Sequence, residues 1–379
     1  MKKQIKFIIA GILLISLTFS LSHAQDDNEE GYQFTDKIRL ETSSVKDQGS
    51  SGTCWCFATT SFLETELIRM GKPEYDLSEM FLVHEAYKKK ADKFIRYHGN
   101  NNFGQGGQAH DALIELEQHG IVPEEVYSGI IYGENKHKHY EMASVLKSFL
   151  ETLTKNTRRK ISPVWDDAYA SVLESYLGEI PATFEYKGKQ YTPHSFAEEL
   201  EISTEDYVEL TSFSHHPFYE QFILELPDNW SHDPYYNLPL DDLMEVINYS
   251  LEEGYSVVWD GDVSSEAFSH RTGIAVVPAE EDASFKAGPV EEKSIDQKYR
   301  QTLFNNFTMT DDHLMHLTGI GEDQNGKKYF LTKNSWDTDS NEYGGFLYMS
   351  DPYVRLNTIA IMVHKDAIPE NILTKLGIQ

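Results

Sequence analysis

Cysteine is nearly absent from this chain of 379 residues, which contains only Cys54 and Cys56. The two thiols are two positions apart, too close in sequence to close a structural loop through a disulfide bond. The sequence therefore excludes a fold that depends on disulfide bonds. Any cysteine that such a chain keeps needs a reason other than cross-linking.

Basic residues are also in short supply. The chain has 33 lysines and arginines against 61 aspartates and glutamates, a formal net charge of -28. So acidic a protein repels nucleic acid and anionic membrane surfaces, and we expect neither as a partner. A solvated acidic surface that favours solubility is a sufficient explanation of the charge.

Long apolar runs are missing after the N-terminus. Three lysines precede an apolar run from Phe7 to Leu21, and Ser22-His23-Ala24 then offers a small-x-small cleavage site. This pattern predicts a bacterial signal peptide over residues 1–24, with an uncleaved N-terminal anchor as the alternative. We expect export to the periplasm or the medium without a membrane anchor.

The mature chain would start near Gln25 and begin with an acidic, mobile leader over residues 25–33. Removing residues 1–24 takes away three lysines and no acids, so the formal charge moves from -28 to -31. The remaining roughly 350 residues can bury a large core, as one large domain or two packed lobes.

Apolar periodicity divides the chain into a helical first part and a β-rich last part. It predicts one buried face on a helix over 54–70, a helix capped by Ser78, and a third helix over 109–119. Between the two parts we expect helical, charged residues over 134–162, a hairpin over 185–191, a helix opening at Thr192-Pro193 and an irregular stretch over 207–238. The last part predicts a helix over 240–253 and strands over 256–259, 313–320 and 327–333.

The last two of these strands flank a polar turn that contains Asn325-Gly326. An antiparallel hairpin closed there would bring His313 and Asn334 side by side. His316 competes with His313, but the two side chains would point to opposite faces of a strand, so only one can meet a given partner. The hairpin favours His313, and a structural role is the alternative for either histidine.

Cys54 opens the first predicted helix, where unpaired amides and the helix dipole would lower the pKa of its thiol. His313 would take the thiol proton, and Asn334 would accept the ring N–H that fixes the tautomer of His313. Gln48 and the Cys54 backbone N–H would stabilise an oxyanion, and Trp336 would shield the histidine–asparagine bond from water. The alternative is that Cys54 is a buried, inert thiol with no catalytic role.

Cys56 would lie roughly 200° around the helix from Cys54, so it should pack inward, although a redox role stays open. Gly106 and Gly107 would let a peptide backbone approach and form hydrogen bonds, and we count Trp336 with them among the substrate-binding residues. His215-His216-Pro217 lacks a metal-binding partner at helical or hairpin spacing, so we predict a structural role. We expect no metal and no cofactor.

These residues resemble the papain family of cysteine peptidases, because Ser51-Gly52-Thr53-Cys54-Trp55 is similar to its cysteine signature. The resemblance is strongest to the bleomycin hydrolase and aminopeptidase C branch and runs from about Val45 to Leu376. The segments that carry it are Gln48 to Trp55, Asp206-Tyr207-Val208, Tyr236 to Pro239, Trp259 to Val263, His313-Leu314-Met315 and Asn334-Ser335-Trp336.

The resemblance implies a papain-like, two-lobed α+β fold over residues 34–379. The helical lobe would take about 45–130, an insertion about 131–240 and the β-rich lobe about 241–365. It further implies that Cys54 is the nucleophile, His313 the base and acid, Asn334 the orienting residue and Gln48 the oxyanion donor. Gly106 and Gly107 match the glycines that bind the substrate backbone.

Three departures from the family pattern matter. Ser51 replaces a cysteine that forms a disulfide in papain-like enzymes, and Asp337 stands where a glycine is usual. The chain also stops at Gln379, without the C-terminal arm that lies in the cleft of the branch members and restricts them to aminopeptidase action. An open cleft would admit internal peptide bonds.

We therefore expect a cysteine peptidase that hydrolyses peptides or proteins through an acyl-enzyme on Cys54. The alternatives are a non-catalytic peptide-binding protein on the same fold, or an acyl transferase that uses the same thiolate. Aminopeptidase or endopeptidase action, side-chain preference and physiological substrate stay open. The oligomeric state stays open too, because the cytoplasmic hexamers of the branch are no guide to an exported protein.

Overall fold

The computed structural model describes residues 31–155, 160–280 and 282–378. The predicted signal peptide and most of the predicted leader lie outside these residues. The last leader residues are held in place: the backbone N–H of Gln33 donates to Oε1 of Gln324 at 3.1 Å, and the rings of Tyr32 and Phe34 stack at 5.6 Å. The mobility predicted for the leader stays a prediction, because most of its residues lie outside the described ones.

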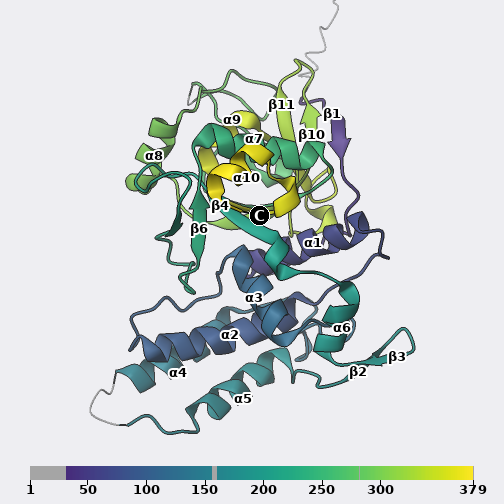
Figure 1. The fold of residues 1–379 in the computed structure, drawn as a ribbon, viewed down its shortest axis with the longest axis vertical. Helices are drawn as coiled ribbons and strands as arrows, with labels where there is room; N and C mark the ends of the chain where they lie inside the picture. The colour runs from purple at the N-terminus through teal and green to yellow at the C-terminus, as the bar shows by residue number, and fades with distance from the viewer. Residues whose placement is uncertain (1–30, 156–159, 281, 379) are drawn as a thin grey trace, which may run out of the picture.

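Helices form one lobe of the molecule, below α1 in Figure 1. Its elements are α1 (Cys54–Arg69), α2 (Glu79–Arg96), α3 (Ala109–His119), α4 (Tyr140–Thr154), α5 (Trp165–Leu177), the hairpin β2 (Phe184–Tyr186) and β3 (Lys189–Tyr191), and α6 (Pro193–Leu200). Their apolar faces share a single core, which runs from Trp55 in α1 to Leu200 in α6. Among the described residues, no helix is long and apolar enough to cross a membrane.

A large, mostly antiparallel sheet forms the second lobe, above α1 in Figure 1. Its strands are β1 (Thr35–Arg39), β4 (Tyr207–Thr211), β5 (Gln221–Ile223), β6 (Pro234–Asn237), β7 (Val257–Gly261), β8 (Phe268–Ser269), β9 (Ile274–Ala275), β10 (His313–Glu322), β11 (Lys328–Lys333), β12 (Phe346–Ser350) and β13 (Thr358–His364). They pair in the order β5-β6-β4-β13-β7-β10-β11-β12-β9-β8, with β1 on β10. The helices of this lobe are α7 (Leu240–Glu252), α8 (Gln297–Asn305), α9 (Asp351–Asn357) and α10 (Glu370–Leu376).

Local sequence signals located several of the helix starts. The first predicted helix begins at Cys54, and the third has the predicted bounds Ala109–His119. The hydroxyl of Ser78 accepts the backbone N–H of Phe81 at 3.0 Å, and Thr192 caps α6 in the same way. Each cap satisfies an otherwise orphaned backbone donor, which is why these residues mark helix starts.

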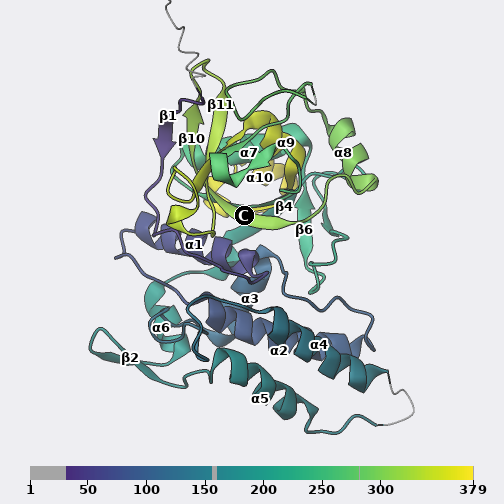
Figure 2. The same cartoon turned by 180° about the vertical axis from the view of Figure 1, so that it is seen from behind.

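Two expectations about packing were wrong. Helix α1 is buried on nearly all sides rather than on one face, because it runs between the two lobes, as Figure 2 shows from behind. Its buried Glu64 is neutralised by Lys46, whose Nζ lies 3.1 Å away. A helix that must bury polar side chains in this way needs such a partner.

The stretch expected to be irregular over 207–238 instead contributes β4, β5 and β6 to the main sheet. The insertion is therefore divided between the lobes, since α4 to α6 pack on the helical core. Strand β4 pairs with β13, where Ala360 faces Thr211. That partner lies about 150 residues away in the sequence, so no local pattern could predict the pairing.

Candidate active site

Cys54 lies at the junction of the two lobes, as the first residue of α1. The turn before it is held by a 2.6 Å hydrogen bond between the hydroxyls of Ser51 and Thr53. Cys54 as a whole is 8% exposed, and the backbone of Leu314 in β10 is hydrogen-bonded to its thiol. The nucleophile expected from the sequence therefore lies beside the first residues of β10.

His313 is the first residue of β10, and its Nε2 lies 2.8 Å from Oδ1 of Asn334. The same Oδ1 accepts the backbone N–H of Ser335 at 2.8 Å, so it is an acceptor and His313 donates from Nε2. This geometry matches the predicted role of Asn334 in fixing the tautomer. It leaves Nδ1 of His313 without a hydrogen, in the form that can take up a proton.

The hairpin register differs from the expected one. The paired residues of β10 and β11 end at His316 opposite Lys333, and the register shifts between Leu317 and Gly319. His313 and Asn334 consequently meet just beyond the ladder rather than as a cross-strand pair. The bulge adds a residue to one strand and turns its end toward the partner.

His316 points to the opposite face of β10, as predicted. Its Nδ1 lies 2.9 Å from the hydroxyl of Ser61 in α1, and burial lowers its pKa well below the ordinary value. It is a neutral structural histidine that fastens β10 to α1.

Trp336 lies over the histidine–asparagine pair. Its ring centroid is 4.8 Å from that of His313, with the planes tilted by 31°, and 4.9 Å from that of His270. The indole thus packs on the ring of His313, as expected for a shield. Its predicted contact with substrate stays a prediction.

Gln48 is connected to the same pair through Ser335. The Ser335 hydroxyl donates to Oε1 of Gln48 at 2.6 Å, and Nε2 of Gln48 donates to the carbonyl of Ser51 at 2.8 Å. The amide is therefore oriented with its nitrogen toward the turn before Cys54. One of its two N–H groups is used there, and the other remains for an oxyanion.

The electrostatics of Cys54 differ from the expectation. Burial raises the pKa of its thiol to about 12, and the carboxylates of Asp311, Asp260 and Asp228 add to the rise. Burial likewise lowers the pKa of His313 to about 4. Burial thus disfavours the charged form of each group, because each charged form would lose hydration.

The loop Gly104–Gln108 is built onto the turn that precedes Cys54. Oε1 of Gln105 accepts the backbone N–H of Gly52 at 2.8 Å, and its carbonyl accepts the indole N–H of Trp55 at 3.0 Å. The buried ammonium of Lys90 donates to the carbonyl of Gly106. Both predicted substrate glycines therefore lie close to the nucleophile.

A side chain on either glycine would force its neighbours to shift. A Cβ atom on Gly107 would lie 2.8 Å from Oδ2 of Asp111 and 3.1 Å from the ring of Trp55. A Cβ atom on Gly106 would overlap the carboxylate of Asp228. An acidic side chain thus lies directly against the glycine that was expected to receive substrate.

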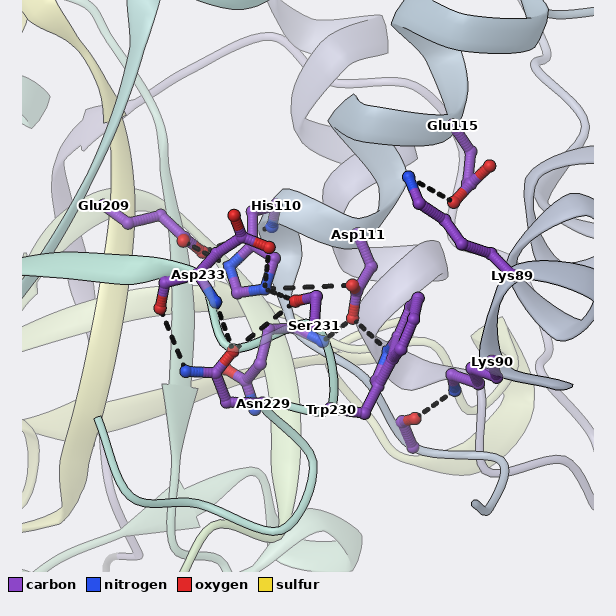
Figure 3. Close-up of polar contacts among 12 residues, drawn as sticks. Lys89, Lys90, His110, Asp111, Glu115, Glu209, Asn229, Trp230, Ser231 and Asp233 are labelled. Atoms are coloured by element: carbon purple, nitrogen blue, oxygen red, sulfur yellow. Dashed lines mark hydrogen bonds and ion pairs between the residues drawn. The ribbon is translucent and has the colours of Figure 1, made fainter. Parts of the chain in front are cut away.

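Asp228 belongs to the segment Leu226–Asp233, which is anchored on the helical lobe as Figure 3 shows. The indole N–H of Trp230 donates to Oδ2 of Asp111 at 2.7 Å, and Nε2 of His110 lies 2.8 Å from the hydroxyl of Ser231. Lys93 donates to the carbonyl of Ser231. We call this segment the Asp228 loop; sequence reasoning missed it, because one aspartate in a Pro-Asp-Asn turn carries no distinguishing signal.

His215 and His216 do meet an acidic partner, which the sequence spacing did not reveal. Their Nε2 atoms lie 3.1 and 2.8 Å from the two carboxylate oxygens of Glu225. Gln301 accepts the backbone N–H of Ser214 with Oε1 and donates from Nε2 to Nδ1 of His215 at 3.1 Å. His215 must then carry its hydrogen on Nε2, where a metal would need a lone pair, so the set fits hydrogen bonding better than metal binding.

Cys56 packs inward, as predicted. It is fully buried, and its thiol lies 3.3 Å from the carbonyl of Glu79 at the start of α2. Burial raises its pKa well above the ordinary value. Such a thiol is inert.

Comparisons with known proteins identify the family of this chain. A model of the Peptidase C1-like family matches residues 15–378. Aminopeptidase C of Streptococcus thermophilus is 24% identical, over 92% of this chain and 85% of that protein. The mitochondrial cysteine proteinase 1 of Saccharomyces cerevisiae (strain ATCC 204508 / S288c) is 21% identical, over 94% of this chain and 81% of that protein.

The fold has a solved counterpart. The crystal structure of PepW from Lactobacillus rhamnosis aligns with a TM-score of 0.72 and 21% identity, over 90% of this chain and 84% of that chain. The α+β, papain-like architecture expected from the sequence is thereby confirmed.

Proposed function

Because the chain belongs to the Peptidase C1-like family and is a peptidase of the cysteine type, we propose that Cys54 is its nucleophile and His313 its general base and acid. Asn334 orients His313, and Gln48 stabilises the oxyanion. The observation that carries this assignment is the convergence of Cys54, His313 and Asn334 from α1, β10 and the end of β11 at one buried junction.

The reaction begins with a neutral pair. Nδ1 of His313 takes the thiol proton as the sulfur of Cys54 attacks the carbonyl carbon of the peptide and forms the C–S bond. The carbonyl oxygen becomes an oxyanion, which accepts hydrogen bonds from Nε2 of Gln48 and from the Cys54 backbone N–H. The positive imidazolium is stabilised by Oδ1 of Asn334, which accepts its Nε2–H.

Collapse of the oxyanion breaks the C–N bond. His313 gives its proton to the leaving amine, and a thioester remains on Cys54. Water then attacks the thioester, with its proton passing to Nδ1 of His313 and on to the departing sulfur. The products are an amine and a carboxylic acid, and the enzyme returns to its starting form.

Two substitutions test these roles. Cys54→Ala should abolish peptide hydrolysis while Cys56→Ala, the matched control on the same helix, should leave it unchanged. His313→Ala should suppress alkylation of Cys54 by iodoacetamide at neutral pH, because the thiol pKa of about 12 then has no base to offset it. Activity in a folded Cys54→Ala protein would refute the proposal.

The site also supports action at free N termini. Asp228 lies against Gly106, and Nδ2 of Asn102 donates to one of its carboxylate oxygens at 2.9 Å. Burial raises the pKa of Asp228, whereas the positive charge of Lys90 lowers it. A partly buried carboxylate with one amide donor suits the α-ammonium of a peptide.

An extended substrate that continued past Gly106 would have to displace the Asp228 loop. The sequence had left internal cleavage open as an alternative. The position of Asp228 and the names of the aminopeptidase C and G relatives support aminopeptidase action instead. Residue 228 would take part in specificity rather than in bond breaking.

Paired substrates separate the two kinds of peptidase. A leucine amide with a free amino group should be cleaved, and its N-acetyl analogue should not. Asp228→Asn should raise KM for the free substrate by about tenfold or more, since hydrogen bonds to charged groups contribute 1.5–3 kcal/mol. Asp241→Asn, which removes an exposed charge on α7, is the control. Equal cleavage of the acetylated peptide would refute aminopeptidase action and leave the role of Cys54 intact.

The N-terminal pattern supports export of the mature enzyme. Three lysines, one apolar run and a small-x-small site over residues 1–24 are the features that a signal peptidase reads. Expression in a bacterial host should yield a periplasmic or secreted protein that begins near Gln25. An intact N-terminus in the cytoplasmic fraction would contradict export.

A further inference from the structure

The side-chain amide of Asn334 has a second partner, which decides the direction in which the amide points. Nδ2 of Asn334 lies 3.1 Å from Nδ1 of His270, in the 3-10 turn His270–Thr272 that follows β8. We propose that His270 is a positioning residue that holds Asn334 with its oxygen toward His313. This inference rests on the proposed function of His313 as the base.

The direction of the hydrogen bonds follows from a serine at the far end. The hydroxyl of Ser340 donates its single hydrogen to the carbonyl of Asp337 at 2.5 Å. It can therefore only accept from Nε2 of His270, which lies 2.7 Å away. His270 thus carries its hydrogen on Nε2 and presents a lone pair on Nδ1.

That lone pair selects one orientation of the Asn334 amide. Nδ2 must donate to His270, so Oδ1 faces His313 and accepts its Nε2–H at 2.8 Å. The backbone N–H of Ser335 makes the same choice. The chain of donors from His313 through Asn334 and His270 to Ser340 has one direction, and it keeps Nδ1 of His313 free of hydrogen.

Reversing the direction of these hydrogen bonds would prevent His313 from acting as a base. If His270 carried hydrogens on both nitrogens, the Asn334 amide would turn its oxygen to His270 and its Nδ2 to His313. Nε2 of His313 would then have to accept, with its hydrogen moved to Nδ1, the atom that must take the thiol proton. Burial lowers the pKa of His270 to about 4, which keeps it neutral.

The surroundings of His270 maintain this arrangement. Trp336 packs edge-on against its ring at 4.9 Å and also covers His313, so one indole keeps water from both bonds to Asn334. Nδ2 of Asn341 donates to the carbonyl of His270 at 2.9 Å and fixes the backbone of the turn. The histidine is therefore held on three sides, as a group that orients another must be.

Two replacements of His270 separate positioning from packing. His270→Phe keeps a ring against Trp336 but removes the acceptor, and it should lower kcat by about tenfold with little change in KM, the loss expected for one hydrogen bond. His270→Gln offers an amide oxygen in place of Nδ1 and should recover most of that loss. Arg271→Ala, in the same turn, is the control for local disturbance.

The pH profile of activity distinguishes the two roles, because a residue that only packs would leave it unchanged. A misoriented Asn334 stabilises the imidazolium of His313 less, so the acid limb of kcat/KM for His270→Phe should shift to lower pH by roughly half to one unit. A wild-type kcat and acid limb in folded His270→Phe would overturn the inference, as would a His270→Gln protein no better than His270→Phe. Neither result would bear on the role of Cys54, because the Cys54→Ala variant tests that role separately.

Discussion

His110 fastens the Asp228 loop to the helical lobe, and its charge makes this contact sensitive to pH. Its Nδ1 lies 2.5 Å from Oε2 of Glu209 and its Nε2 lies 2.8 Å from the Ser231 hydroxyl, as Figure 3 shows. Burial alone would lower the pKa of His110, but the carboxylates of Glu209, Asp111 and Asp233 raise it to about 9. The folded protein therefore binds a proton at His110 that the unfolded chain releases near pH 6.5.

The sign of the effect follows from this difference. A raised pKa in the folded state contributes stability that is fully present below pH 6.5 and is lost as the pH rises through about 9. The shift between the ordinary and the folded pKa corresponds to about 3 kcal/mol at 1.36 kcal/mol per unit. Because His110 is buried, solvent screening takes away little of this energy.

The free energy of unfolding in urea at a series of pH values measures the effect. Wild type and His110→Gln should differ most at pH 6, and the difference should shrink by about 3 kcal/mol between pH 6.5 and pH 10. His119→Gln is the matched control on α3, because burial lowers the pKa of His119 and its removal should change nothing above pH 6.5. A difference between wild type and His110→Gln that does not vary with pH would refute the assignment of a charged His110.

Three further substitutions test the neighbourhood of the site. Asp337 has φ 74° and ψ 150°, a conformation nearly restricted to glycine. Asp337→Gly should therefore raise the melting temperature by roughly 1–2 °C in scanning calorimetry, whereas Asp339→Gly in the following turn should lower it. A lower melting temperature for both variants would contradict the strain at Asp337. Gln48→Ala should lower kcat by about 10²–10³ with KM unchanged in steady-state kinetics, and a smaller loss would remove it from the oxyanion site. Lys90→Met leaves the carbonyl of Gly106 without its donor and should cost about 1–3 kcal/mol in urea unfolding, so an unchanged midpoint would contradict that contact.

Sequence alone located the parts of the site that sit at the ends of regular elements. Cys54 begins a helix and His313 begins a strand, and both positions follow from short-range apolar patterns and a turn signal. The contact between His313 and Asn334 was also foreseeable, because a hairpin connects them over few residues. Its register was not, since a bulge near Gly319 depends on packing that no local pattern records.

The residues that tune the site could not be predicted in the same way. Asp228 and His270 lie in short irregular segments whose positions depend on partners far away in sequence, Gly106 and Asn334 respectively. Asp337 is an instructive intermediate case. The sequence marked it as a departure from glycine, but only its backbone dihedral angles show why glycine is the residue that fits.

The thiol of Cys54 shows where reasoning from one local effect fails. A helix N-terminus stabilises a nearby anion by at most about 2 kcal/mol, which would lower a thiol pKa by about one and a half units. Burial and three carboxylates act the other way and raise it from 9.0 to about 12, so they outweigh the helix. Position on a helix therefore does not make this thiol reactive. Its reactivity depends on proton transfer to His313, because only the paired imidazolium brings a compensating charge into the same buried junction. The reactivity of the Cys54 sulfur therefore depends on the orientation of His313, which is set through Asn334 and His270.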